Sequence, residues 1–460
     1  MLLRHFLSPL GLSLLCVWVA ASPPVLAQSP TAAEFQADTG RFALHAQTTF
    51  IWQAKPAFGA AYTGPNSLSP LEERAYSFTA TADIGLRLWD GAQIHLNPEV
   101  AQGVPLSRLT GAGGISNGEL ARTSGPEISS YRARLFLLHR WNAGGDIEAL
   151  APGFNEVGGS ASAKRWTLVL GTFSLLDYFD PNPYAKDPRS QFFNWSYLTH
   201  GAWDYAADAR GYSNGLVLEY RSPTWAVRAG RSMLPVESNG LTLDGNLGQH
   251  YGDQVEFESD LPLRLPAGPL RARVLAFRNQ AVMGNYTDAL ALGTASNSTP
   301  NVALVRREQT KTGWGFTLQA PLSEDSGLFL RLSRNNGETE TFAFTEIDQQ
   351  TALGGQFTGA PWGRRSDRWG LALAINELSS PHRAYLAAGG QGFFLGDGAL
   401  NYGPERVLET WYRIALPDLA THAGRVQSAV SLGWQHITNP GYNQDRGPVH
   451  TYSLRWHSEF

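Results

Sequence analysis

Hydrophobic and polar residues alternate along much of this chain with the period of two that is typical of β-strands. Residues 447–460 show the pattern most clearly, with apolar side chains on one face and polar side chains on the other. The apolar face comprises Tyr452, Leu454, Trp456 and Phe460, and the polar face comprises Thr451, Ser453, Arg455, His457 and Glu459. Because an apolar face opposite a charged face suits a wall between lipid and water, the segment predicts a strand of a membrane barrel.

The same alternation predicts further strands, separated by turn sequences such as Asp90-Gly91, which is typical of a tight hairpin. These strands are expected at 41–53, 78–88, 93–99, 131–141, 216–220, 225–228, 314–318, 328–332, 369–376 and 430–434. In the first of them one face comprises Phe42, Leu44, Phe50 and Trp52, and the other comprises His45, Gln47 and Thr49. Most turns are short, whereas the connections around 55–74 and 177–208 are long. Short turns at one rim and long loops at the other are typical of outer-membrane barrels.

The strand predicted over residues 131–141 has the length that a membrane wall needs. Its ten steps span about 33 Å at ~3.3 Å per residue, or about 25 Å along the membrane normal when the strand is tilted by ~40°. The expected outward residues are Tyr131, Ala133, Leu135, Leu137, His139 and Trp141, and the expected inward residues are Arg132, Arg134 and Arg140. A soluble β-sandwich could show the same alternation, with its arginine face merely solvated.

The amino terminus predicts export from the cytoplasm. Residues 1–27 read as a secretory signal peptide, with basic Arg4, an apolar core over 6–21 and a cleavage site after Ala27. Residues 28–40 are expected to form a periplasmic lead-in, and residues 41–460 the barrel domain. The only cysteine, Cys16, lies in the signal segment, so disulfides and thiolate metal sites are not expected in the mature chain.

Composition supports a barrel and excludes other classes. The chain has 14 Trp, 16 Tyr, 22 Phe and 48 Gly, yet no later run approaches the ~18 apolar residues of a membrane helix. The net charge of −4 arises without any long basic run, so nucleic acid is not an expected partner. Gly211-Tyr212-Ser213-Asn214-Gly215 matches the hydrolase motif G-x-S-x-G, but a strand pattern rather than a helix follows it. We therefore expect no enzyme activity.

The most distinctive segment is Gly171–Tyr212, GTFSLLDYFDPNPYAKDPRSQFFNWSYLTHGAWDYAADARGY. It contains the patterns D-x-F-D-x-N-x-Y-A-x-D-P-R-x-Q-F-x-N-W, over 177–195, and W-D-Y-A-A-D-x-R-G-Y, over 203–212. These patterns resemble the signature of the carbohydrate-selective outer-membrane porins, the OprB-type family. The stretches 342–348, 362–364, 439–443 and 445–449 are also similar to that family.

The resemblance implies an all-β transmembrane antiparallel barrel of about sixteen strands in the outer membrane of a Gram-negative bacterium, with one or more long extracellular loops folded into the lumen. It implies passive diffusion of small sugars, glucose-like monosaccharides first, without a cofactor or a metal. The expected partners are sugars and outer-membrane lipid. A homotrimer is an open alternative, because no single outward patch identifies a subunit interface. A general or anion-preferring diffusion pore, or a plugged scaffold barrel, would share these bulk features.

Two sets of residues are candidates for the pore lining. Alternation places Arg87, Arg132, Arg134, Arg228 and Arg331 on lumen faces, and the signature segment contributes Asp177, Asp180, Asp187, Arg189, Trp195 and Asp204. Arginines can donate to sugar hydroxyl oxygens, carboxylates can accept from hydroxyl hydrogens, and aromatic rings can pack on C–H faces.

Structural roles compete with each of these assignments. The arginines could instead pair with carboxylates such as Glu99, Glu219 and Glu256 across the wall, and the acidic residues could cap turns. Asp180, Asn182 and Asp187 could also supply oxygen ligands to calcium, although their spacing lacks the glycine and the distal glutamate of a helix-loop-helix site.

Overall fold

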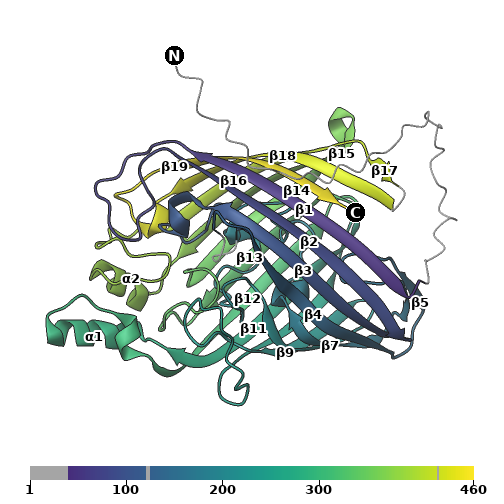
Figure 1. Cartoon of the computed structure of the whole chain (residues 1–460), viewed down its shortest axis with the longest axis horizontal. Helices are drawn as coiled ribbons and strands as arrows, with labels where there is room; N and C mark the ends of the chain where they lie inside the picture. The colour runs from purple at the N-terminus through teal and green to yellow at the C-terminus, as the bar shows by residue number, and fades with distance from the viewer. Residues whose placement is uncertain (1–39, 121–124, 422–423) are drawn as a thin grey trace. The chain divides into compact units, whose positions relative to one another are not determined.

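The computed structural model describes residues 40–120, 125–421 and 424–460, so the predicted signal peptide and nearly all of the predicted lead-in lie outside the described residues. Within the described part, sixteen strands pair antiparallel with their neighbours in chain order, and the last strand pairs back to the first (Figure 1). This pairing closes the sheet and leaves no free edge, as a wall in lipid requires, because lipid offers no hydrogen-bond partners. The predicted barrel of about sixteen strands is confirmed.

Every strand segment predicted from alternation coincides with a barrel strand, although the predicted segments 41–53 and 447–460 extend one to two residues beyond the first and the last strand. The barrel strands are β1 (Phe42–Lys55), β2 (Glu73–Trp89), β3 (Ala92–Val104), β4 (Ser129–Asn142), β7 (Arg165–Phe173), β8 (Ser213–Arg221), β9 (Trp225–Ser232), β10 (Tyr251–Leu265), β11 (Gly268–Met283), β12 (Arg307–Pro321), β13 (Gly327–Asn335), β14 (Gln349–Gly359), β15 (Arg364–Glu377), β16 (Glu405–Ala415), β18 (Gly424–Thr438) and β19 (Val449–Glu459). Three shorter strands lie outside the ring: β5 (Ile147–Leu150) pairs with β6 (Gly159–Ser162), and β17 (Leu419–Thr421) pairs with β18.

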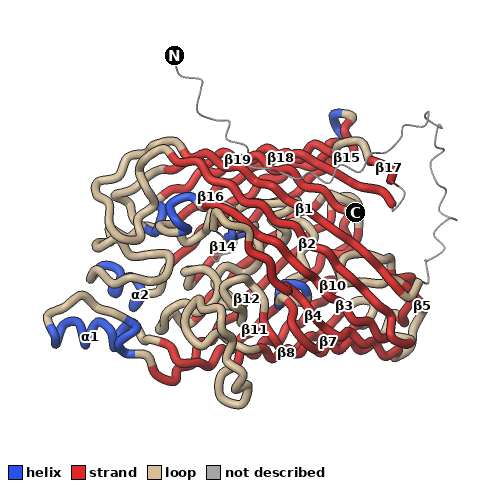
Figure 2. The backbone as a smooth tube through the Cα atoms, in the orientation of Figure 1, coloured by secondary structure: helices blue, strands red, loops and turns tan. Residues whose placement is uncertain are grey.

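The two rims differ as expected. One rim carries short turns, together with the β5–β6 hairpin, and the other carries the long connections. The helices are α1 (Tyr286–Ser296), α2 (Ser380–Ala387), η1 (Leu106–Leu109), η2 (Leu175–Asp177), η3 (Trp195–Tyr197), η4 (Val302–Val305), η5 (Ala360–Trp362) and η6 (Pro440–Tyr442). Figure 2 shows α1 and α2 together at the long-loop rim, which faces the cell exterior in outer-membrane barrels. No helix among the described residues is long and apolar enough to cross a membrane.

The wall is two-sided because its side chains alternate. On β1, Phe42 and Trp52 are exposed on the outer surface, whereas Thr49 and Gln53 are buried inside. On β19, Trp456 is exposed and Arg455 is fully buried. The faces predicted for these two strands are therefore confirmed.

A β-bulge at Ala133 reverses the faces at the start of β4. Asn97 of β3 pairs with Arg134, but the next residue, Pro98, pairs with Arg132, so Ala133 is left without a partner. Pro98 has no N–H to donate, and proline within a sheet is tolerated at such bulges. Arg132 is consequently exposed on the outer surface, and Tyr131 turns inward to hydrogen-bond Glu99. The sequence-based placement of Arg132 in the lumen, and of Tyr131 outside it, is therefore wrong.

The bulge makes opposite accessibility the expected result for two neighbouring positions. A nitroxide attached to cysteine in Arg132→Cys should be reached by oxygen dissolved in lipid, and one in Tyr131→Cys by a water-soluble nickel chelate, as measured by power-saturation electron paramagnetic resonance. Leu135→Cys is the matched control, because it faces lipid with or without the bulge. The reverse pattern at 131 and 132 would mean that the bulge is absent.

Candidate functional site

The connection from β7 to β8, residues 174–212, folds into the barrel and is called the constriction loop below. A buried ion pair fastens it to the wall: Nε of Arg331 on β13 lies 2.7 Å from a carboxylate oxygen of Asp180, and both side chains are fully enclosed. Arg331 also donates to the carbonyl oxygens of Tyr197 and Ala185, and Thr317 of β12 donates to Asp180. The loop is thus held to the wall by charge-assisted bonds.

Other carboxylates hold backbone N–H groups of the inward segments. Glu409 of β16 accepts from the N–H groups of Phe193 and Asn194, at 2.6 and 3.0 Å. Asp204 of the constriction loop accepts from three consecutive N–H groups over residues 342–344 and lies 3.2 Å from Nζ of Lys311. Irregular backbone inside a barrel must find such partners, since buried N–H groups without acceptors are costly.

Two glycines on the inner wall make room for the loop. A Cβ atom added at Gly433 of β18 would come within 2.5 Å of the ring of Phe193, and one added at Gly327 of β13 would overlap the ring of Tyr184. Larger residues at these positions would displace the loop from the wall. The position of the constriction loop therefore depends on residues more than a hundred positions away in sequence.

A cavity of ≈ 140 Å³ lies between β2, β3 and β4 and the inward loops. Wall residues, the constriction loop and the connections around residues 118–120 and 343–344 line it. The lining side chains that carry charge or aromatic rings are Glu99, Glu119, Tyr131, Arg189, Trp195, Tyr205, Asp208, Arg210, Tyr212 and Phe344. Its volume is below the ~300–1,000 Å³ of sites that enclose a whole ligand. It is therefore a small space with polar and aromatic walls.

Arg189 is the charged centre of this cavity. Its Nε lies 2.6 Å from a carboxylate oxygen of Glu119, and one of its terminal nitrogens lies 3.1 Å from Glu99 of β3. Tyr131 and Tyr212 also donate to Glu99, at 2.5 and 3.0 Å. Two threonines of β2 also donate to these carboxylates: Thr79 to Glu119 and Thr81 to Glu99.

Burial and charge act in opposite directions on the loop carboxyls near this centre. Burial raises the pKa of Glu119 above its usual value, although the Arg189 guanidinium opposes the change. Burial also raises the pKa of Asp187, but Arg189 and the Ser190 hydroxyl outweigh it, so that this pKa falls below its usual value. The Asp187 carboxylate also accepts from the backbone N–H of Arg189 at 3.0 Å and thereby shapes the turn that carries the arginine.

Aromatic rings form another side of the cavity. Trp195 stacks on Phe344 with ring centroids 5.5 Å apart and planes 11° apart, and its indole N–H donates to the carbonyl of Asn117. Tyr205 packs against the same phenylalanine at 4.8 Å. Arg210 lies over the ring of Tyr131 at 4.3 Å. Fixed donors, acceptors and flat apolar faces therefore meet in one small space.

The remaining candidate residues lie around this centre rather than in it. Arg134 of β4 forms a two-bond ion pair with Asp177, at 2.7 and 2.8 Å, and stacks over Tyr212. Arg228 of β9 is buried against Glu219, Glu256 and Glu258 of the wall, the structural role that sequence analysis had left open. Arg87 donates to the carbonyl of Gly158, in the connection that carries the β5–β6 hairpin.

The structure therefore separates the candidates. Arg189 and Trp195 line the cavity; Asp180, Asp204, Arg228 and Arg331 are almost fully buried; and Arg132 faces outward. Among the described residues, no group of three or more His, Cys, Asp or Glu side chains could hold a metal ion, and Asp180 is occupied by Arg331. Ser213 of the hydrolase-like motif begins β8 and donates to the carbonyl of Met233.

Sequence reasoning missed several cavity residues as lining groups. Glu119 carries no local signal that distinguishes it from other loop residues, and Glu99 was considered only as a structural partner. Arg210 and Phe344 lie in the family-like stretches 203–212 and 342–348 but were not assigned to the pore lining. Tyr131 did have a signal, because Pro98 on the neighbouring strand could have indicated the bulge that turns it inward.

A closed sixteen-stranded barrel whose long loops narrow a polar lumen defines an outer-membrane porin. Residues 66–460 match the carbohydrate-selective porin, OprB family. The chain therefore belongs to this family, and it is a non-enzymatic, carbohydrate-selective channel of the Gram-negative outer membrane.

A similar solved structure supports this fold. The OprB structure of Pseudomonas putida is similar with a TM-score of 0.64 at 14% identity, covering 91% of this chain and 94% of that chain. The outer-membrane channel DcaP of Acinetobacter baumannii has a TM-score of 0.47 at 9% identity, covering 91% of this chain and 97% of that chain. No curated protein matches this chain in sequence.

Proposed function

We propose that this porin passes glucose-like monosaccharides and that the cavity around Arg189 is where they are selected. The observation that supports the proposal is the meeting of Arg189, Glu99 and Glu119 with the Trp195–Phe344 stack in one narrow space. The guanidinium can donate to a sugar hydroxyl oxygen, the carboxylates can accept from hydroxyl hydrogens, and the rings can pack on a C–H face.

Selection in a pore requires weak and multiple contacts, because a tight site would retain the sugar. In the structure two of the five N–H groups of the Arg189 guanidinium already bond Glu119 and Glu99, so a sugar hydroxyl competes with two carboxylates for the same cation. The net gain under such competition is small. Weak binding and rapid release follow from this arrangement.

The alternative is a general or anion-preferring diffusion pore. Anion preference would need an unpaired cationic lining, but Arg189 faces two carboxylates, and Arg134, Arg228 and Arg331 each pair with at least one. These ion pairs argue against an anion-preferring pore. The expectation of a homotrimer stays a prediction, which native mass spectrometry of the detergent-solubilised protein would check.

Single-channel conductance in a planar bilayer tests the proposal. Glucose should reduce the current saturably, with an apparent dissociation constant in the millimolar range or weaker, about −4 kcal/mol. An uncharged non-sugar solute of similar size is the control and should reduce the current only through viscosity. Equal effects of the two solutes would favour the general diffusion pore.

A further inference from the structure

A band of small side chains crosses the outer surface of the barrel from β18 to β4. Successive strand partners define its main row: Ser428, Ser458, Thr48, Ala80, Val100 and Ser130. A parallel row holds Ala46 opposite Ala82, and Pro98 opposite Arg132. The wall is therefore thinner along this band than on either side of it.

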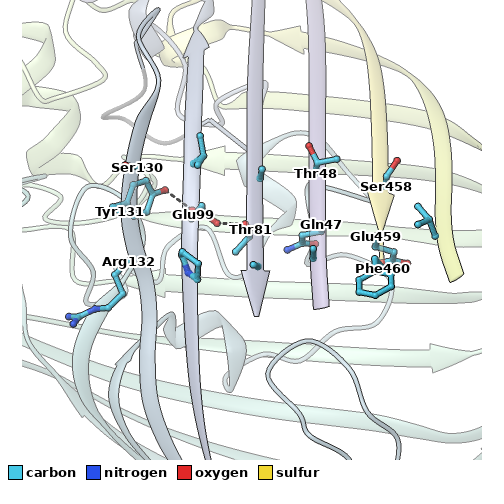
Figure 3. A pocket seen from close by; sticks show the side chains of 16 residues that line it. Gln47, Thr48, Thr81, Glu99, Ser130, Tyr131, Arg132, Ser458, Glu459 and Phe460 are labelled. Atoms are coloured by element: carbon cyan, nitrogen blue, oxygen red, sulfur yellow. Dashed lines mark hydrogen bonds between the residues drawn. The ribbon is translucent and has the colours of Figure 1, made fainter. Parts of the chain in front are cut away.

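Bulky side chains border the band. Phe50 and Phe78 lie on one side, and Leu44, Ile84 and Leu96 on the other, as the pairing of β1, β2 and β3 shows. The result is a groove of ≈ 730 Å³ on the lipid-facing surface. Figure 3 shows its labelled lining residues on five adjacent strands, with Arg132 at one end and Phe460 at the other.

The groove runs obliquely up the wall. Rows of strand partners are perpendicular to the strands, and the strands of a barrel are tilted by ~35–45°. Phe460 follows the end of β19 at the short-turn rim, whereas Arg132 is the fourth residue of β4, which begins at the long-loop rim. The arginine therefore marks the end of the groove that lies toward the outer leaflet.

Arg132 has no carboxylate partner among the described residues; its one hydrogen bond is a long one, 3.5 Å, to the hydroxyl of Thr172. Arg231, an outward arginine of β9, instead forms a two-bond ion pair with Asp253. A lipid-facing cation costs ~2–4 kcal/mol at the midplane and less near the interface. An external anion at this place would remove that cost.

Three of the four hydroxyl groups in the main row already have a partner within the wall. Thr48 donates to the carbonyl of Thr79, and the hydroxyls of Ser428 and Ser458 bond to each other at 2.8 Å. Covering them with hydrocarbon therefore sacrifices no hydrogen bond. The groove thus suits an apolar chain, and the arginine at its outer end suits a phosphate.

We propose that the groove binds one acyl chain of a phosphorylated outer-leaflet lipid, with Arg132 contacting the phosphate of its headgroup. The charge at one end and the apolar floor along the rest of the groove match the two halves of such a molecule. The bulge at Ala133 serves this site, because without it Arg132 would point into the lumen.

Native mass spectrometry of the full-length protein, folded in detergent, tests this assignment with bis-phosphorylated lipid A as the probe. Ala80→Phe fills the groove, and Arg132→Gln removes its charge. The matched controls are Ala276→Phe, on an exposed position of β11, and Arg231→Gln, at another outward arginine. Heat-modified mobility on a gel confirms that each variant is a folded barrel.

We expect the lipid A adduct to fall about fivefold in Arg132→Gln, the factor that corresponds to ~1 kcal/mol per basic residue at a charged membrane surface. The adduct should fall at least as much in Ala80→Phe, and both control variants should retain it. Dephosphorylated lipid A should bind the unaltered protein weakly, to the same extent as lipid A binds Arg132→Gln. Equal adducts in all variants, or no adduct with the unaltered protein, would overturn the proposal. So would oligomers of the unaltered protein that Ala80→Phe dissociates while it retains lipid, since a second copy would then occupy the groove.

Discussion

Arg189→Gln is expected to weaken the sugar block and to make the pore prefer cations. The substitution removes the charged donor from the cavity and leaves Glu99 and Glu119 without their ion-pair partner. Because the bond from Arg189 to a sugar is made in competition with Glu99 and Glu119, its net contribution is ~0.5–1.5 kcal/mol, so the apparent affinity for glucose should fall about three- to tenfold. Sugar titration of the single-channel current measures this loss.

The charge effect of the same substitution has an independent measurement. Carboxylates at a narrowing attract cations, so the reversal potential in a salt gradient should move toward that of a cation-selective pore. Arg231→Gln removes an arginine from the outer surface and should leave both sugar block and reversal potential unchanged. If Arg189→Gln behaved like this control, the current and the sugar would pass elsewhere.

The second large effect is expected from Arg331→Met, which should release the constriction loop from the wall. It leaves the buried Asp180 unpaired and removes donors from the carbonyls of Tyr197 and Ala185. Removing one partner of a buried ion pair destabilises the folded structure by ~3–5 kcal/mol. The wall keeps its closed hydrogen-bonded strand pairing, so the substitution should destabilise the attachment of the loop rather than the barrel. A released loop should give a larger conductance and a weaker glucose block.

Limited trypsin digestion of the folded protein would report the release directly. Lys186, Arg189 and Arg210 are cleavage positions within the loop, and mass spectrometry identifies cuts after them. Arg271→Gln is the matched control, because its ion pairs are to Asp260 and Glu258 on the neighbouring wall strand. A pore that kept its conductance and its protease resistance in Arg331→Met would show that the ion pair does not hold the loop.

Sequence reasoning succeeded for the strands because the relevant information is local. In β1 and β19, alternation identified the faces of Phe42, Trp52, Arg455 and Trp456 without knowledge of the neighbouring strands. It failed at Arg132 because a bulge depends on the pairing partner, in this case Pro98. A shift of one residue exchanges the two faces of a strand.

The sequence predicted which segment contributes to the candidate site, but not which of its residues line the cavity and which anchor the loop. The distinctive segment over residues 171–212 does contain Arg189 and Trp195, which line the cavity. Its other charged residues look equivalent in sequence, yet Asp180 and Asp204 are buried anchors. Only the partners separate these roles, and Arg331 and Lys311 lie far away along the chain.

By itself, the sequence determined that this protein is a two-sided β-wall related to the carbohydrate-selective porins, because a period of two and a dense local motif can be read without contacts. The tertiary structure decided how the strands close, which arginines remain accessible and which residues meet in the cavity around Arg189. Ion pairs such as Asp180–Arg331 and Glu99–Arg189 join residues 151 and 90 positions apart, and the folding of the whole barrel brings them together. Charge energies fall with distance and depend on burial, so the same residue types become wall, anchor or pore lining only once their neighbours are in place.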